Sequence, residues 1–175
     1  MKRRLVAILL LVVAGAAIYW FAIRDRTATP RVSVPRPTST IGSGSSAVGV
    51  AADGAVLGWL PLPADAALPR LSLSTPPQRP RLTGSVLQQA LVLGAAPAVL
   101  RPYIESSFYG ASGVDVELKA GVQLRFGSAA GAARKWKAAA AVLADPSVTS
   151  LDYVDLHAPG RPATGGSGHT LPSVP

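Results

Sequence analysis

The pair of alternating apolar runs in the C-terminal third constrains the fold of this chain more than any other sequence feature. The apolar positions are Val114, Val116 and Leu118 in the first run and Val122, Leu124 and Phe126 in the second. A period of two is typical of a strand with one buried face. A three-residue loop with Gly121 at a positive φ keeps both apolar sets on one face, because it sets Leu118 opposite Val122. The same register places Asp115 opposite Arg125.

A second hairpin is predicted earlier in the chain, where apolar residues alternate around the Asp53–Gly54 pair. The Asp-Gly dipeptide is a strong signal for a two-residue turn between antiparallel strands. Such a turn would pair Val50 with Leu57. Two residues further along each strand it would pair Val48 with Trp59, so that the apolar set lies on one face.

Two helices and a final strand complete the predicted body. Ser85 and Gln88 have the spacing of a capping box, and the apolar stripe that follows them ends at Gly94. Ser128 can cap a second, Ala-rich helix that is predicted to run to about Ala144, and the last strand is predicted over 151–157. Strands outnumber helices, so we expect an α+β fold with a mostly antiparallel sheet and two or more helices packed on it.

An uncharged apolar segment near the N-terminus predicts a single transmembrane helix. Residues 5–23 contain no charged side chain, and about 20 apolar residues are needed to cross the hydrocarbon core of a bilayer. The basic residues within 1–4 favour a cytoplasmic N-terminus and an extracytoplasmic body. The positions expected in this anchor include Leu5, Leu11, Ile18, Trp20 and Ile23. A cleaved signal peptide is the alternative, because the Ala-Gly-Ala of residues 14–16 resembles a cleavage site.

Composition divides the rest of the chain into a linker, a body and a tail. Residues 24–46 are rich in Thr, Ser, Pro and Gly, which favours a flexible tether. The body is predicted to span residues 47–159. Residues 160–175 resemble the linker in composition, so we expect a disordered tail after Pro159 and Pro162, which prevent a long continuation of the last strand.

Charge and cysteine content exclude several functional classes. The net charge is +8, but the basic residues are dispersed, whereas a nucleic-acid-binding face needs clustered Lys and Arg. The one cluster, Arg134–Lys137, is interpreted as a solvated helix face around a buried Trp136. The sequence contains no cysteine, which excludes thiol catalysis, Cys-ligated zinc and disulfide bonds.

No motif in the sequence predicts catalysis. His157 and His169 are not joined by a cluster of carboxylates that would complete a metal site. The proximity of Asp155 to His157 is interpreted as the charged rim of a strand rather than as a catalytic pair. A nucleophile elbow, a phosphate-binding loop and a dinucleotide fingerprint are all missing from the sequence. We therefore expect a binding protein rather than an enzyme, with no cofactor, metal, small-molecule substrate or nucleic-acid partner.

The order of these segments resembles the C-terminal β domain of the FtsQ/DivIB family of bacterial cell-division proteins. The carrying segments are the hairpin Val48–Trp59, the Leu-Pro stretch 60–69, the helix near Ser85, GVDVELKAGVQLRFG, the helix with KWKAAAAVLADP, and LDYVDLHAPGRPA. The short basic N-terminus and the single anchor are also similar to the family. The linker 24–46 stands where family members carry a small POTRA domain.

The resemblance implies a non-catalytic, single-pass membrane protein that acts as a scaffold at the division septum. Its partners would be small division proteins similar to FtsB/DivIC and FtsL. In the family, a segment of the FtsB partner adds to the last strand of the β domain by β-augmentation. The resemblance places the partner-binding residues of this chain at Leu151, Tyr153, Val154, Asp155, Leu156 and His157.

An alternative from another class is an anchored extracytoplasmic module that binds cell-wall polymer or anionic lipid. Its binding residues would be Arg134, Lys135, Trp136 and Lys137. This alternative predicts that the body binds isolated cell envelope in a salt-sensitive way, because salt screens exposed charges.

Overall fold

The body of the protein is a single sheet with helices on one face. The computed structural model describes residues 35–62, 67–73 and 77–171. The strands are β1 (Pro37–Ile41), β2 (Val48–Ala51), β3 (Val56–Leu57), β4 (Arg70–Leu71), β5 (Ile104–Gly110), β6 (Gly113–Leu118), β7 (Gln123–Gly127), β8 (Tyr153–Asp155) and β9 (Ala163–Gly165). The helices are α2 (Gly84–Gly94) and α3 (Ala132–Leu143), with short 3-10 turns η2 (Gly44–Ser46) and η3 (Arg101–Tyr103).

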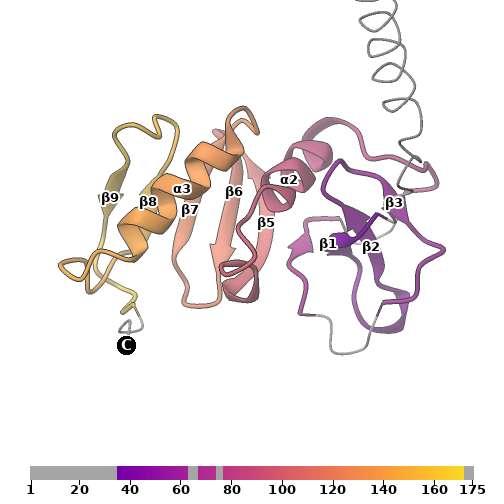
Figure 1. Cartoon of the computed structure of the whole chain (residues 1–175), viewed down its shortest axis with the longest axis horizontal. Coiled ribbons are helices and arrows are strands. Elements are labelled where there is room, and N and C mark those ends of the chain that lie inside the picture. Colours follow the sequence, from indigo (N-terminus) through magenta and orange to yellow (C-terminus); the bar gives the residue numbers. More distant parts are fainter. Residues whose placement is uncertain (1–34, 63–66, 74–76, 172–175) are drawn as a thin grey trace, which may run out of the picture. The chain divides into compact units, whose positions relative to one another are not determined.

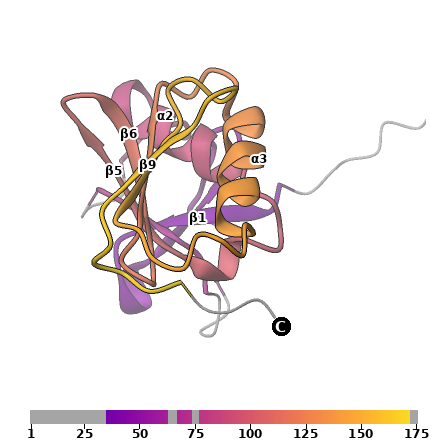
Figure 2. The ribbon, with the colours of Figure 1, turned by 90° about the vertical axis from the view of Figure 1, so that its left-hand side faces the viewer.

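The nine strands form one mixed sheet in the order β3-β2-β1-β4-β5-β6-β7-β8-β9. The pairs β1–β4, β4–β5 and β7–β8 are parallel, and the remaining neighbours are antiparallel. Both helices lie on the same side of the sheet (Figures 1 and 2). The predicted α+β class is therefore confirmed.

The β6–β7 hairpin has the register that the sequence predicts. The Leu118 N–H donates to the Val122 carbonyl at 2.9 Å, and the Gly121 N–H donates to the Leu118 carbonyl at 2.8 Å. Gly121 has φ +85°, and Asp115 lies opposite Arg125. The glycine takes the left-handed conformation that closes a three-residue loop, because residues with a Cβ rarely adopt it.

The β2–β3 hairpin differs from its predicted register by one residue. Val50 lies opposite Val56 rather than Leu57. The Gly54 N–H donates to the Ala51 carbonyl at 2.9 Å with φ +81°, so this loop also contains three residues rather than two. The predicted pair of Val48 with Trp59 does not form, and the Trp59 side chain is 67% exposed.

The two helices begin differently from their predicted starts. Thr83 occupies the N-cap of α2 without a side-chain cap, so Ser85 and Gln88 form no capping box there. The Gln88 side chain instead accepts the Ala129 N–H at 2.9 Å, which ties α2 to the segment that precedes α3. Helix α3 begins at Ala132, and its N-cap is Gly131 in the left-handed conformation rather than the predicted Ser128.

The core lies between the inner face of the sheet and the two helices. Trp136 of α3 is completely buried, and its indole N–H donates to the Val92 carbonyl of α2 at 2.8 Å. The Phe126 ring of β7 lies beneath it, with ring centroids 4.9 Å apart. One side chain therefore joins both helices to the centre of the sheet.

Two of the predicted segment boundaries are wrong. The linker predicted over 24–46 contains β1, which is paired on both sides and buries Ser39 and Ile41 completely. The tail predicted to be disordered over 160–175 contains β9 and an isolated bridge between Ser150 and Thr170. Composition misled in both cases because these segments contain few apolar residues and are held largely by strand pairing.

The predicted anchor, residues 5–23, lies outside the described residues, as do residues 24–34 of the predicted linker. Over residues 35–62, 67–73 and 77–171, neither helix is both long and apolar enough to cross a membrane.

We predict that Gly94→Ala destabilises the body. A Cβ at Gly94 would lie 2.6 Å from the Cα of Ala52, in the β2–β3 loop against which α2 ends. Overpacking against backbone costs about 1–3 kcal/mol of unfolding free energy. Urea unfolding measures this loss. A Cβ at Gly160 would have no neighbour within 4 Å, so Gly160→Ala is the matched control, and equal stabilities for the two variants would contradict the packing described here.

Candidate docking edge

Strand β8 occupies the position that the sequence assigned to partner binding. It runs parallel to β7, with Tyr153 opposite Gln123 and Asp155 opposite Arg125. Its apolar residues point into the core: Leu151, Val154 and Leu156 are at most 1% exposed. Tyr153 and Asp155 are half-buried on the other face, and His157 is exposed. Apolar and polar residues of this segment thus lie on opposite sides of the sheet.

The outer edge of β8 is covered by the chain's own C-terminal segment. Tyr153 lies opposite Gly165, Val154 opposite Thr164, and Asp155 opposite Ala163, in an antiparallel pair with β9. The expectation that β8 is the last strand of the sheet is therefore wrong, and β9 takes that place (Figure 1).

The prolines that follow β8 end the strand without releasing the chain. Pro159 lies at position i+1 of a turn in which the Arg161 N–H donates to the Ala158 carbonyl at 2.9 Å, and Pro162 follows this turn. The chain thereby reverses direction, and β9 returns along β8. Proline at i+1 of a turn is favoured because its φ is already fixed near the value that a turn needs.

Asp152 holds the segment that follows β9. Its Oδ1 accepts the Gly168 N–H at 2.7 Å and lies 3.1 Å from Nδ1 of His169. Its own backbone N–H donates to the Gly165 carbonyl at 2.9 Å, and the Leu151 N–H donates to the His169 carbonyl at 3.0 Å. We name residues 163–171 the C-terminal strap.

Glycines allow the strap to lie this close to β8. A Cβ at Gly165 would lie 2.6 Å from the Tyr153 ring, and one at Gly166 would overlap the Asp152 carboxylate. A Cβ at Gly168 would lie 2.6 Å from the same carboxylate. Sequence reasoning missed these contacts because a Gly/Ser-rich composition is shared by flexible linkers and by segments that closely approach another backbone.

The outer face of β8 is polar and internally paired. The Arg125 guanidinium lies 3.8 Å from the centre of the Tyr153 ring, a cation–π arrangement. Asp155 Oδ1 accepts the His157 backbone N–H at 2.9 Å and lies 2.8 Å from His157 Nδ1. His157 Nε2 lies 3.3 Å from the Ser112 carbonyl oxygen. Both imidazole nitrogens thus face oxygen atoms of the strand rims, and neither faces a nucleophile.

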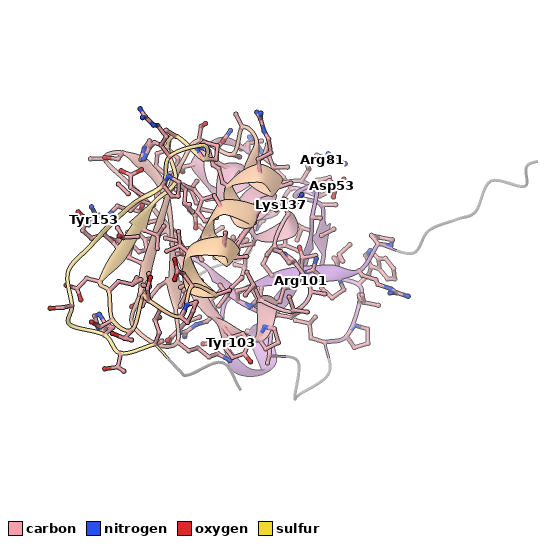
Figure 3. All side chains as sticks on the ribbon, turned by 60° about the vertical axis from the view of Figure 1, so that its left-hand side comes forward. Asp53, Arg81, Arg101, Tyr103, Lys137 and Tyr153 are labelled. Carbon is pink, nitrogen blue, oxygen red and sulfur yellow. The ribbon has the colours of Figure 1, made fainter. Side chains whose placement is uncertain are left out.

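The basic cluster of α3 does not form a surface patch. Lys135 is 6% exposed, and its Nζ donates to the Phe126 carbonyl at 2.6 Å and to the Ser128 carbonyl at 3.1 Å. Burial lowers the Lys135 pKa from its usual value. Trp136 lies in the core, so of these four residues Arg134 and Lys137 alone are exposed. Figure 3 labels Lys137 on α3. This placement weakens the alternative of polymer or lipid binding through the cluster.

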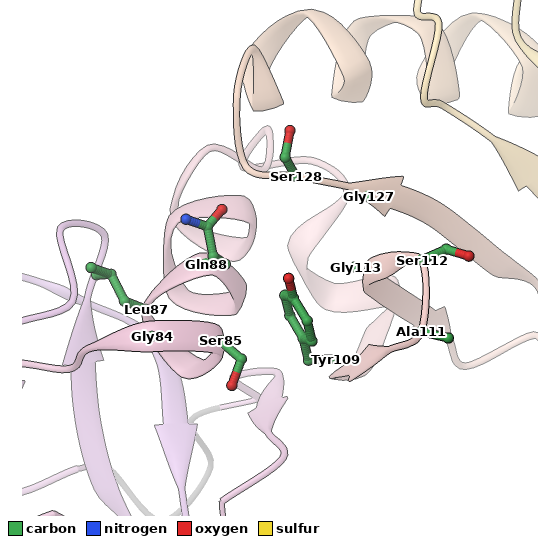
Figure 4. A pocket seen from close by; sticks show the side chains of 10 residues that line it. All are labelled: Gly84, Ser85, Leu87, Gln88, Tyr109, Ala111, Ser112, Gly113, Gly127 and Ser128. Carbon is green, nitrogen blue, oxygen red and sulfur yellow. The ribbon is translucent and has the colours of Figure 1, made fainter.

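A cleft of about 670 Å³ lies between the start of α2 and the connections that follow β5 and β7 (Figure 4). Its polar side chains include Ser85, Tyr109, Ser112 and Ser128, and its lining contains no carboxylate, imidazole, ammonium or guanidinium group. Gln88 also lines the cleft, but its amide oxygen already accepts a backbone N–H. The cleft therefore offers hydroxyls without a base to activate them.

No known protein-family model matches this sequence, and no curated protein matches it significantly.

We predict opposite pH effects for two carboxylates near β8. The His157 backbone N–H lowers the Asp155 pKa below its usual 3.8, whereas desolvation raises that of Asp115. The Asp155 contribution is present above pH 3.8 and is lost as pH falls through the folded-state pKa, while ionisation of Asp115 costs stability as pH rises.

Urea unfolding of Asp155→Asn and Asp115→Asn between about pH 5 and pH 3 tests these signs, because neither asparagine titrates. The stability advantage of the unmodified chain over Asp155→Asn should shrink as pH falls. Its stability relative to Asp115→Asn should improve over the same range. Changes of the same sign for both variants would contradict this assignment.

Proposed function

We propose that this chain is a non-catalytic, membrane-anchored scaffold of the bacterial division septum, similar to the FtsQ/DivIB proteins. Its body lies outside the cytoplasm, and the end of the sheet at β8 binds an extended segment of a small division partner. The partners are proteins similar to FtsB/DivIC and FtsL. The anchor proposed for residues 5–23 keeps the N-terminus in the cytoplasm.

The observation that carries this proposal is the construction of β8. Its inner side is fixed in the core by Val154 and Leu156, and its inner edge pairs in parallel with β7 over three residues. Its outer edge pairs with an antiparallel segment of three residues, β9, at the end of the sheet. A rigid strand whose outer backbone groups accept an extended segment has the properties that β-augmentation requires.

The order of elements also supports the proposal. The β6–β7 hairpin is followed by α3 and then by β8, as in the segments on which the resemblance to FtsQ/DivIB rests. Helix α3 crosses the face of the sheet and returns the chain so that β8 lies parallel to β7. The last core strand therefore lies next to the end of the sheet, where the three-residue β9 covers its outer edge.

The polar side of β8 supplies groups that can distinguish partners. Tyr153 presents a half-buried ring held by Arg125, and aromatic residues of this kind often dominate binding energy at interfaces. Asp155 and His157 form a paired, exposed rim beside it. Backbone pairing would supply affinity, and these side chains would supply specificity.

We predict that Tyr153→Ala weakens partner binding by about tenfold or more, because the aromatic anchor is lost. The measurement is the affinity of the full-length chain, reconstituted in membrane discs, for a purified FtsB/DivIC-like partner. Tyr109→Ala is the matched control, since Tyr109 is 50% exposed on β5, away from this end of the sheet. Equal affinities of the two variants would argue against docking at β8.

A further inference from the structure

We propose that the C-terminal strap occupies the β8 edge of its own chain, and that a partner strand binds this edge by displacing the strap. The strap also shows which segment the edge selects: an antiparallel one with glycine opposite Tyr153 and hydrogen-bond donors facing Asp152. This inference rests on the proposed function, because it concerns the same edge.

The strap is held mainly by polar contacts. Its strand residues Ala163 and Thr164 are exposed, and so are Gly166 and Gly168. Leu171 at its end is partly buried against the core. Little apolar surface therefore becomes exposed to water when the strap detaches. Its detachment costs far less free energy than unfolding of the body.

The Tyr153 ring makes the edge selective for glycine. A Cβ at Gly165 would lie 2.6 Å from ring atoms of Tyr153, and the ring is itself held by Arg125 at 3.8 Å. A larger residue at this position would have to move the ring off the guanidinium. The next position is also restricted, because Gly166 has φ +79° and approaches the Asp152 carboxylate.

Asp152 makes the edge selective for segments that carry hydrogen-bond donors. Its carboxylate receives a backbone N–H and faces an imidazole nitrogen of the strap, and its side chain is 44% exposed. The His169 ring lies against Gly121, where a Cβ would overlap it. The His169 side chain thus lies between Asp152 and the tip of the β6–β7 hairpin.

The short connection between β8 and β9 makes the strap a strong competitor. Seven residues, 156–162, separate the two strands, and they include the turn closed by Arg161. A short tether of this kind gives an effective concentration of about millimolar order. If the strap leaves the edge for a tenth of the time or less, a partner's apparent affinity falls by about tenfold or more.

The test uses the full-length chain with Gly165→Val and Gly166→Val, which remove the strap from β8 by steric overlap. The probe is a fluorescent peptide with the sequence of residues 161–175. We expect the double variant to bind this peptide at least about tenfold more tightly than the unmodified chain, whose edge is occupied. A peptide with the same two valines should bind neither chain, and Gly160→Val is the control chain.

Equal binding of the peptide to the unmodified chain and to the double variant would overturn the proposal. So would the absence of binding to a double variant that still unfolds cooperatively in urea.

Amide hydrogen exchange in the unmodified chain tests the same idea without relying on the variant. The Leu151 and Asp152 N–H groups donate to the strap, whereas the Gln123 N–H donates to the Asp152 carbonyl within the sheet. We expect the first two to exchange at least about tenfold faster than Gln123, because the strap opens locally. Exchange of all three at one common rate would contradict a displaceable strap.

The two proposals can fail separately. If the peptide results fail while Tyr153→Ala still weakens partner binding, the partner adds beside β9 and does not replace it. If the peptide binds as expected but no division partner does, the edge and its selectivity remain and the septal function is wrong.

Discussion

The position of the candidate edge depends on the burial of Trp136. Its indole N–H reaches the Val92 carbonyl of α2, and its ring packs on Phe126 of β7. These contacts fix α3 across the sheet beside α2, and α3 in turn sets where the chain re-enters the sheet as β8. Lys135 strengthens the same junction by donating to two carbonyls at the end of β7. Two residues of the basic cluster in the sequence, Lys135 and Trp136, thus have structural roles.

The sequence predicted best where side-chain pattern and backbone requirement agree. In the β6–β7 hairpin the alternation allows one register, and Gly121 occupies the one loop position that needs a positive φ. In the β2–β3 hairpin the pattern fits two registers. Val50 and Leu57 are both buried, but Leu57 lies opposite Gly49 and therefore on the other face from Val50. Burial on both faces removed the signal that alternation normally provides.

The polar segments could not be predicted from composition. Strand β1 contains Thr38, Ser39 and Thr40, all buried between β2 and β4, with the Thr38 hydroxyl donating to the Val50 carbonyl. The strap is ordered by Asp152 and by backbone pairing, which leave no trace in hydropathy. Both segments look like linkers because the contacts that order them come from partners distant in the sequence. The residues predicted to bind a partner lie in β8 and beside it, but β9, which pairs with the outer edge of β8, was not foreseen.

A covered strand of this kind reconciles two demands on an edge. An unpaired strand would invite association with other chains, whereas a permanently covered one would exclude a partner. Occupation by a short, glycine-rich segment of the same chain protects the backbone groups of Tyr153–Asp155 and leaves them available to a stronger competitor. The proposed septal scaffold would then expose its docking strand only when a suitable partner is present.

Hydrogen–deuterium exchange of the full-length chain with and without an FtsB/DivIC-like partner tests this account most directly. The account predicts that partner binding speeds exchange in residues 163–171 while β8 stays protected, because one strand replaces another. Unchanged exchange protection of both β8 and the strap in a saturated complex would contradict the account.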